Sequence, residues 1–290
     1  MTTRLAALGT PAAVLGTPAL HRPGLGVTLG SGLLAVGLVA LFWWLIGHAI
    51  TIAHEGGHAL VTVLAGGKVA RVQVRRDRTG RTDSFVPGRG VPTTLAGYLA
   101  PSAFGLLAAL LITFGRFAAV LWISLALLLL ILTVAGTWFT RFAVVTTGLL
   151  LVLALRTASE TVVLWTACTW AWVMLLGGLV HVILHHGVGR DHHSLKEKTW
   201  IPVVFWSWFF AAFALATLWF GFSWLTGISD PPTLHHGSSP DAIHELVRHD
   251  RNPRDAPLPA GVRGLSAGGQ GVGLVGMGLV GMGSPAFDRS

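Results

Sequence analysis

Long apolar stretches alternate with short polar segments along most of this chain. The first stretch, 27–66, has a helical pattern almost throughout. The later stretches are at about 92–114, 118–136, 141–156, 160–185 and 200–226. A helix needs about 20 apolar residues to cross a bilayer, so the first stretch is long enough to require tilt, a kink near Gly47 or an interfacial entry turn. The pattern predicts an all-α polytopic membrane protein with about six transmembrane helices, with five or seven as alternatives.

The segment 68–75, directly after the first stretch, alternates polar and apolar residues. This period of two indicates a strand with one apolar face. Thr79, Gly80 and Arg81 are turn candidates, and 82–86 could return as a second strand. We therefore expect a small β-hairpin at the membrane surface after the first helix.

Both ends of the chain differ from this central region. Residues 1–26 are rich in Ala, Gly and Pro, and residues after Asp230 are polar, then rich in Pro and finally in Gly. Segments with so much glycine bury too little side chain to offset the entropy of ordering their backbone. The sequence predicts a flexible tail at 1–26, a helical membrane domain at 27–226 and a disordered tail at 227–290.

Composition agrees with a membrane protein. Hydrophobic residues make up 52% of the chain and charged residues 11%, whereas soluble domains carry about 25% charged residues. The net charge of +8 does not indicate nucleic acid here, because the basic residues gather in loops between apolar stretches. The one cysteine, Cys168, lies in an apolar stretch and excludes a cysteine-based metal site.

The distribution of Lys and Arg predicts an orientation. With six alternating spans, eleven basic residues of the segments 67–90, 186–199 and Arg141 lie on one side, against four at Arg4, Arg22, Arg116 and Arg156. Cytoplasmic loops carry the excess of Lys and Arg, so the N-terminus is predicted outside the cell membrane and the hairpin in the cytoplasm.

The sequence His54-Glu55-Gly56-Gly57-His58 is an HExxH motif within the first apolar stretch. On a helix, His54 and His58 share one face and can ligate a single Zn²⁺, while Glu55 can take a proton from a water at the metal. Burying ionisable residues in a membrane segment costs free energy, so those found there usually serve a function. The simpler alternative is a pair of helix histidines that bond to neighbouring helices.

Zinc hydrolases usually have three protein ligands and leave a fourth position for water. Our first choice for the third ligand is Asp191, which lies between the fifth and sixth spans on the same predicted side as the motif. Its segment also has the character of an exposed loop, in which Asp191 could simply cap a helix starting near Ser194. Five histidines are rival ligands: His181, His185, His186, His192 and His193.

Tyr98 is the only tyrosine of the chain. Its phenol could stabilise the oxyanion that forms when water attacks a peptide carbonyl, although tyrosine also favours the membrane interface as an anchor. Gly97 beside it would let the second span approach the first closely. His48 lies off the face of His54, and we expect a structural role for it.

Three segments resemble the M50 family of site-2-protease-like zinc metallopeptidases, and most closely its bacterial M50B-like branch. They are the HEGGHAL sequence at 54–60 with the Gly-Gly-Lys that follows, the AGYLAPS sequence at 96–102, and the segment from Gly189 to Pro202. The resemblance implies that His54, His58 and Asp191 bind zinc, that Glu55 is the base, and that substrates are membrane-anchored proteins unwound at the edge of the small sheet. One family motif, Asn-Pro followed by Asp-Gly, is absent, because the only asparagine is Asn252.

The sequence therefore predicts a zinc-dependent intramembrane endopeptidase with the bilayer and membrane-anchored proteins as its partners. Two alternatives stay open. A non-catalytic family member would keep the fold and bind partners without hydrolysis. A haem-binding electron carrier would use histidines from two spans as axial ligands, for example His54 or His58 with His181 or His185, but it would give Glu55 no role.

Overall fold

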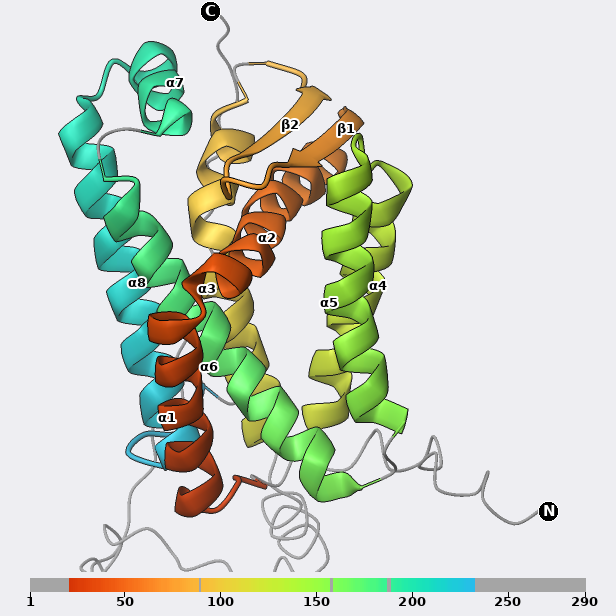
Figure 1. Cartoon of the computed structure of the whole chain (residues 1–290). Helices are drawn as coiled ribbons and strands as arrows, with labels where there is room; N and C mark the ends of the chain where they lie inside the picture. Colours follow the sequence, from red (N-terminus) through yellow and green to blue (C-terminus); the bar gives the residue numbers. More distant parts are fainter. Residues whose placement is uncertain (1–20, 89, 157–158, 187–188, 233–290) are drawn as a thin grey trace, which may run out of the picture. The chain divides into compact units, whose positions relative to one another are not determined.

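The computed structural model describes residues 21–88, 90–156, 159–186 and 189–232, and they form a helical bundle with a small hairpin at one end (Figure 1). The predicted tails fall mostly outside the described residues. The helices are α1 (Leu25–Leu41), α2 (Trp43–Leu64), α3 (Val91–Thr113), α4 (Phe117–Thr133), α5 (Trp138–Arg156), α6 (Glu160–Leu184), α7 (Arg190–Thr199) and α8 (Val203–Thr226). The prediction of a mostly helical protein with a hairpin after its first apolar stretch is confirmed.

Four described helices, α3, α5, α6 and α8, are long and apolar enough to cross a membrane. The pair α1 and α2 passes the same test together, but it bends by 102° at the break between them. Helix α4 is apolar but has 17 residues, slightly fewer than a straight crossing needs. The described helices are therefore those of a multi-pass membrane protein, and its first apolar stretch is a sharply bent helix pair of the kind found in broken spans and re-entrant loops.

The break lies at Phe42, five residues before Gly47, near which the sequence placed a kink as one of three possibilities. Phe42 leaves the helical conformation with φ −118° and ψ 29°. Helix α1 packs mainly against α6, whereas α2 packs against α3 and the hairpin, so the chain must change direction between them. This cause is tertiary, and the local sequence carries neither the glycine nor the proline that usually marks a kink.

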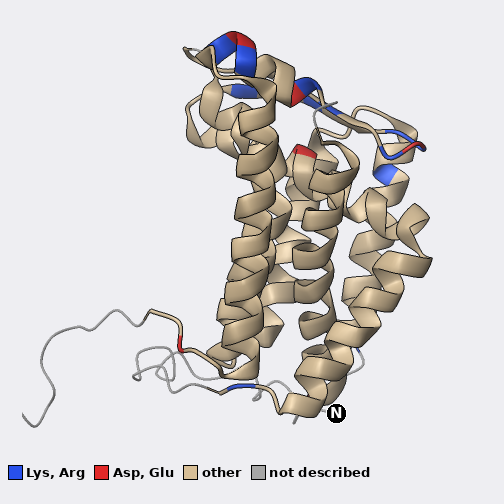
Figure 2. Cartoon of the chain, turned by 90° about the vertical axis from the view of Figure 1, so that its left-hand side faces the viewer, with Lys and Arg blue, Asp and Glu red and all other residues tan. Residues whose placement is uncertain are grey.

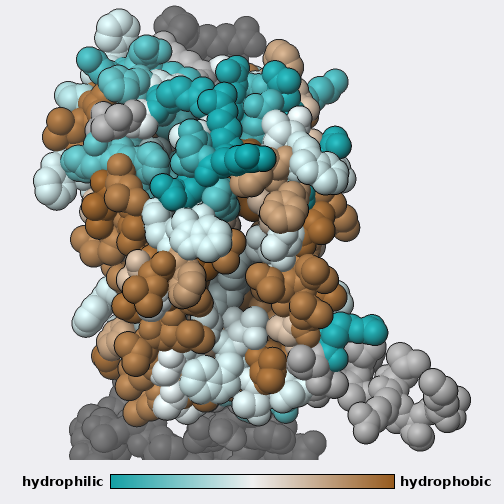
Figure 3. Space-filling view, in the orientation of Figure 1, coloured by the Kyte–Doolittle hydropathy of each residue, from teal (hydrophilic) through white to brown (hydrophobic). Residues whose placement is uncertain are grey.

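Helix α6 lies at the centre of the apolar core. It packs against α1, α3, α4 and α8, and its residues Met174 and Leu175 are almost fully buried. Around this core, many large apolar side chains on the outer helix faces stay exposed, as the lipid-facing side of a membrane bundle requires. Figure 3 shows this hydrophobic surface below a hydrophilic one at the end that carries the hairpin and α7.

The hairpin consists of β1 (Lys68–Val74) and β2 (Gly80–Phe85), which pair antiparallel from Lys68 opposite Phe85 to Val74 opposite Gly80. Its turn is at 75–79, earlier than predicted, because the Asp77 side chain accepts hydrogen bonds from the amide and hydroxyl of Thr79. On its other edge, β1 bonds to the segment after α4, where the Val72 amide donates to the Val134 carbonyl at 2.8 Å. The hairpin is thereby fixed to the bundle.

Charged ribbon segments gather at the end of the bundle that carries the hairpin and α7 (Figure 2). Helix α7 begins at Arg190 and its ten residues are mostly polar. The sequence suggested an exposed loop with a helix start near Ser194, so the helix begins earlier than expected. This placement brings the first turn of α7 over the end of the bundle that holds the HExxH motif.

Candidate metal centre

The HExxH residues lie on α2, and all three of their side chains are buried. His54, Glu55 and His58 are 6%, 4% and 8% exposed. Because His54 and His58 are one helical turn apart, their imidazoles point to the same place, and their Nε2 atoms are 3.2 Å apart. Glycines at 56 and 57 put no side chain between the motif and the neighbouring helices.

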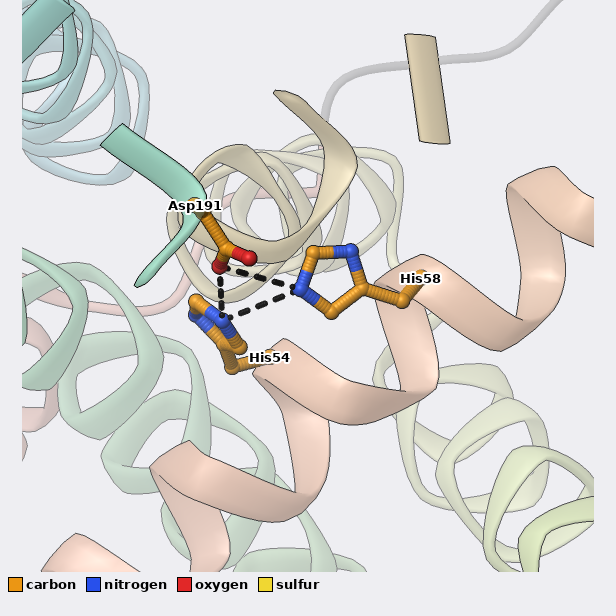
Figure 4. A group of neighbouring side chains, drawn as sticks. All are labelled: His54, His58 and Asp191. Carbon is orange, nitrogen blue, oxygen red and sulfur yellow. Dashed lines mark hydrogen bonds and ion pairs between the residues drawn. The ribbon is translucent and has the colours of Figure 1, made fainter. Parts of the chain in front are cut away.

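Asp191 lies beside both imidazoles. Its Oδ2 is 3.1 Å from Nε2 of His54 and 3.2 Å from Nε2 of His58, as Figure 4 shows. Burial alone would raise the pKa of the Asp191 carboxyl, but hydrogen bonds with the two histidines outweigh it and hold the pKa well below its ordinary range. The first turn of α7 thus supplies an ionised carboxylate to the histidine pair.

The three donor atoms match the geometry of a zinc site. In a tetrahedral site with zinc–ligand distances of about 2.0–2.1 Å, neighbouring ligand atoms are about 3.3 Å apart. The three separations here are 3.1, 3.2 and 3.2 Å. Two imidazoles and a carboxylate are also a ligand set that zinc hydrolases use. His54, His58 and Asp191 are the one group of this kind found among the described residues.

His58 is held in the tautomer that a metal ligand needs. Its Nδ1 is 2.7 Å from the backbone carbonyl of Thr93, on α3, and this carbonyl can only accept a hydrogen bond. Nδ1 therefore keeps its hydrogen, and Nε2 is the nitrogen that can bind a metal once it gives up the hydrogen it shares with Asp191. The Nδ1 of His54 is buried and has no such partner among the described residues.

Helix α3 approaches the two rings at Gly97. A Cβ at this position would lie 2.7 Å from Nε2 of His54 and would also overlap the ring of His58. Only glycine leaves room for both imidazoles at this helix contact. The expectation that Gly97 permits close approach of the first two apolar segments is confirmed, and its contact is with the histidines themselves.

Glu55 faces the hairpin. The hydroxyl of Thr82, on β2, donates to Oε2 of Glu55 at 2.6 Å, and Gly80 packs directly against the same side chain. The hairpin therefore positions the carboxylate of Glu55 next to the histidine pair. Nothing in the local sequence of the motif indicates Thr82 as its partner.

Tyr98 and the rival histidines surround this group. The ring of Tyr98 packs edge-on to His54, at 4.7 Å between centroids, and stacks on Phe210, while its hydroxyl lies against Gly189. His181 also packs on His54, at 5.0 Å between ring centroids, but its nitrogens are not part of the three-atom group. The contact of this hydroxyl with Gly189 favours a packing role for Tyr98 over oxyanion support, and the choice between the two roles stays a prediction.

The other candidate histidines have different surroundings. His192 is fully buried, and burial lowers its pKa to about 4, so it is neutral at ordinary pH. His185, His186 and His193 are likewise outside the group that could hold a metal. His48 is 3.3 Å from the Arg76 carbonyl and packs edge-on to Phe139, which agrees with a structural role.

The two sides of α2 face different cavities. A cavity of about 800 Å³ contains His54, Glu55, His58 and Asp191 and is lined further by residues of β2, α6 and α7. A second cavity, of about 730 Å³, is lined by apolar residues on the opposite side of α2, including Gly56 and Leu60. The polar residues of the motif therefore share one cavity, with room for many water molecules, that also reaches the edge of the hairpin.

Comparison with known proteins agrees with this geometry. The model of a family described as Peptidase M50B-like matches residues 28–221, which is about two thirds of the chain. This chain belongs to that family. No curated protein and no solved structure matches it. The match covers α2, the hairpin and α7, so the M50B-like region contains the whole candidate metal centre.

The haem-carrier alternative loses its support in this M50B-like protein. Axial ligation would require Nε2 of His54 or His58 to face a histidine of α6 across a haem. Instead, both Nε2 atoms face Asp191, and the ring of His181 packs directly on the ring of His54.

Proposed function

We propose that this protein is a zinc-dependent endopeptidase that hydrolyses peptide bonds of membrane-anchored proteins. The observation that carries the proposal is the meeting of three donor atoms, from His54, His58 and Asp191, at separations that fit one tetrahedral ion. Membership of a peptidase family and the position of Glu55 in the same cavity support it.

His54, His58 and Asp191 would hold the zinc ion. When bound, Zn²⁺ polarises the scissile carbonyl and lowers the pKa of the attacking water. Glu55 accepts the proton of this water at its carboxylate and later delivers it to the nitrogen of the leaving amine. Thr82 keeps the carboxylate oriented through its hydroxyl, and Thr93 keeps Nε2 of His58 available.

The edge of β2 offers a place for the substrate backbone. Residues 80–84 line the polar cavity, and among the described residues β2 pairs with β1 alone. A substrate segment must leave its helical conformation before its peptide bonds become accessible, and an extended segment can then add to an open sheet edge. The proposal therefore places the scissile bond between β2 and the metal ligands.

The same proposal includes an orientation. The basic residues of the hairpin, of α7 and of the start of α5 lie at the metal end, while Arg22, Arg116 and Arg156 belong to segments at the other end. By the excess of positive charge in cytoplasmic segments, the metal centre lies near the cytoplasmic side of the cell membrane and the N-terminus outside.

Replacement of the base tests this function. Glu55→Gln should abolish cleavage of a membrane-anchored model substrate by the purified protein while zinc stays bound at one ion per chain, because Glu55 is not a ligand. Glu160→Gln, at the exposed start of α6, removes an equal charge outside the cavity and should leave cleavage unchanged. A wild-type protein that binds zinc and cleaves nothing would instead support the non-catalytic family member, and an active Glu55→Gln protein would refute the assigned base.

A further inference from the structure

The turn of the hairpin places in the polar cavity a cationic side chain that has no partner among the described residues. Arg78 lines this cavity and is half-buried, and its guanidinium makes no hydrogen bond or ion pair with any described residue. Other basic side chains of the cavity have partners: Arg81 bonds to Asp83 at 2.5 Å, and Arg190 donates to the Gly80 carbonyl at 3.0 Å. Arg78 therefore offers a positive charge that no described residue compensates, in the same cavity as the metal centre.

The backbone holds Arg78 in this position. Its φ of 65° is in the left-handed region, which a residue with a side chain rarely adopts and which costs energy. The hydroxyl of Thr51, on α2, donates to the Arg78 carbonyl at 2.9 Å. One turn earlier on α2, Gly47 leaves space for the stem of Arg78, since a Cβ at 47 would lie 2.6 Å from Arg78 Cδ.

These contacts show how far along α2 the stem of Arg78 lies from Glu55. Gly47, Thr51 and Glu55 are successive positions on one side of α2, and Gly47 and Glu55 are about 12 Å apart along the helix axis. An extended peptide covers about 3.3 Å per residue, so this distance corresponds to about three or four substrate residues. Arg78 is therefore placed to contact a substrate side chain at that spacing from the scissile bond.

We propose that Arg78 determines specificity by binding a carboxylate side chain of the substrate, three or four residues from the scissile bond. A guanidinium binds a carboxylate through two parallel hydrogen bonds, which makes it selective for Asp or Glu over neutral residues. The partial burial of Arg78 strengthens such a pair relative to one in open water. This inference deepens the proposed peptidase function and rests on it for the identity of the ligand as a peptide.

A binding experiment can test the inference without relying on hydrolysis. The full-length, zinc-loaded Glu55→Gln protein is placed in phosphatidylcholine nanodiscs and titrated with labelled peptides that carry one apolar span. Each peptide has a single Asp at one position near the end of the span, and each has twins with Asn or Lys at that position. At one position, we expect the Asp peptide to bind at least about tenfold more tightly than its Asn twin.

Variants of Arg78 test whether the preference for the Asp peptide depends on its guanidinium. Arg78→Gln, made in the same Glu55→Gln background, should remove the difference between the Asp and Asn twins, and Arg78→Glu should favour the Lys twin. Arg75→Gln is the matched control, because Arg75 is exposed in the same turn and does not line the cavity. Equal binding of all twins, or a preference that survives Arg78→Gln, would overturn the inference. The inference would also be overturned if the Arg78 variants changed only the effect of added anionic lipid on peptide binding. Arg78 would then bind a lipid headgroup.

The failure of this inference can be told apart from the failure of the proposed function. Proteins that keep Glu55 are assayed for cleavage of the same peptides, with zinc content measured for each variant. Cleavage without an Arg78-dependent preference for Asp would overturn the inference and leave the peptidase standing. An Arg78-dependent preference in binding, with no cleavage by the wild-type protein, would support the binding of a carboxylate by Arg78 and contradict hydrolysis.

Discussion

Gly97→Ala tests the metal centre through a residue that is not itself a ligand. The added Cβ would lie 2.7 Å from Nε2 of His54, whereas non-bonded heavy atoms in contact are about 3.5 Å apart. The imidazole of His54 must therefore move by about 0.7–0.8 Å, and that of His58, which is closer to the added Cβ, by about 1 Å, unless α3 retreats by a similar distance. A zinc–ligand distance tolerates about 0.2 Å, so the three donors can no longer reach one ion with good geometry.

The expected result is a loss of zinc affinity with a modest loss of stability. Changes to residues that position metal ligands typically weaken metal affinity by about 10- to 100-fold. An extra methyl group in a packed interior costs about 1–3 kcal/mol of folding free energy. Zinc affinity is measured by competition with a chelating dye on the purified full-length protein, and folding is measured by thermal unfolding of the metal-free protein.

Gly37→Ala, in the middle of α1, is the control for this substitution. No atom lies within 4 Å of a Cβ at position 37, so the added methyl group should leave zinc binding unchanged. Zinc binding by Gly97→Ala as tight as that of the wild type, in a protein that stays folded without metal, would contradict the role of Gly97 in leaving room for the two imidazoles.

Three further substitutions separate the roles within the site. Asp191→Asn removes the ligand charge and should weaken zinc binding at least tenfold, a result that an unchanged chelator competition would contradict. Thr82→Val removes the hydrogen bond to Glu55 and should slow cleavage by about tenfold with zinc content intact, so an equal fall in zinc content would contradict it. Tyr98→Phe keeps the ring contacts and should leave cleavage near the wild-type rate, because the hydroxyl lies against Gly189; a loss of about 100-fold or more would assign it to the oxyanion.

Local sequence patterns were sufficient to predict the elements whose formation depends on residues close together in the chain. The apolar stretches predicted the helices, and the alternation in 68–75 predicted β1. The spacing of His54 and His58 placed both rings on one side of α2, because a helix brings every fourth residue to the same face.

Features that depend on contacts between residues far apart in the chain could not be predicted from local sequence patterns. The bend at Phe42 follows from different packing partners of α1 and α2, and no glycine or proline marks it. The early start of α7 at Arg190 accompanies the contact of Asp191 with α2, more than 130 residues away in the chain. The bond from Thr82 to Glu55 likewise joins two elements that the sequence shows separately.

X-ray absorption spectroscopy of the purified, zinc-loaded protein tests the central claim most directly. We expect one zinc ion per chain with two imidazole nitrogens and at least one carboxylate oxygen at about 2.0–2.1 Å. The imidazole scattering should be lost in the His54→Ala, His58→Ala double variant. A spectrum without imidazole ligands, or one that the double variant leaves unchanged, would contradict the claim that α2 binds the metal.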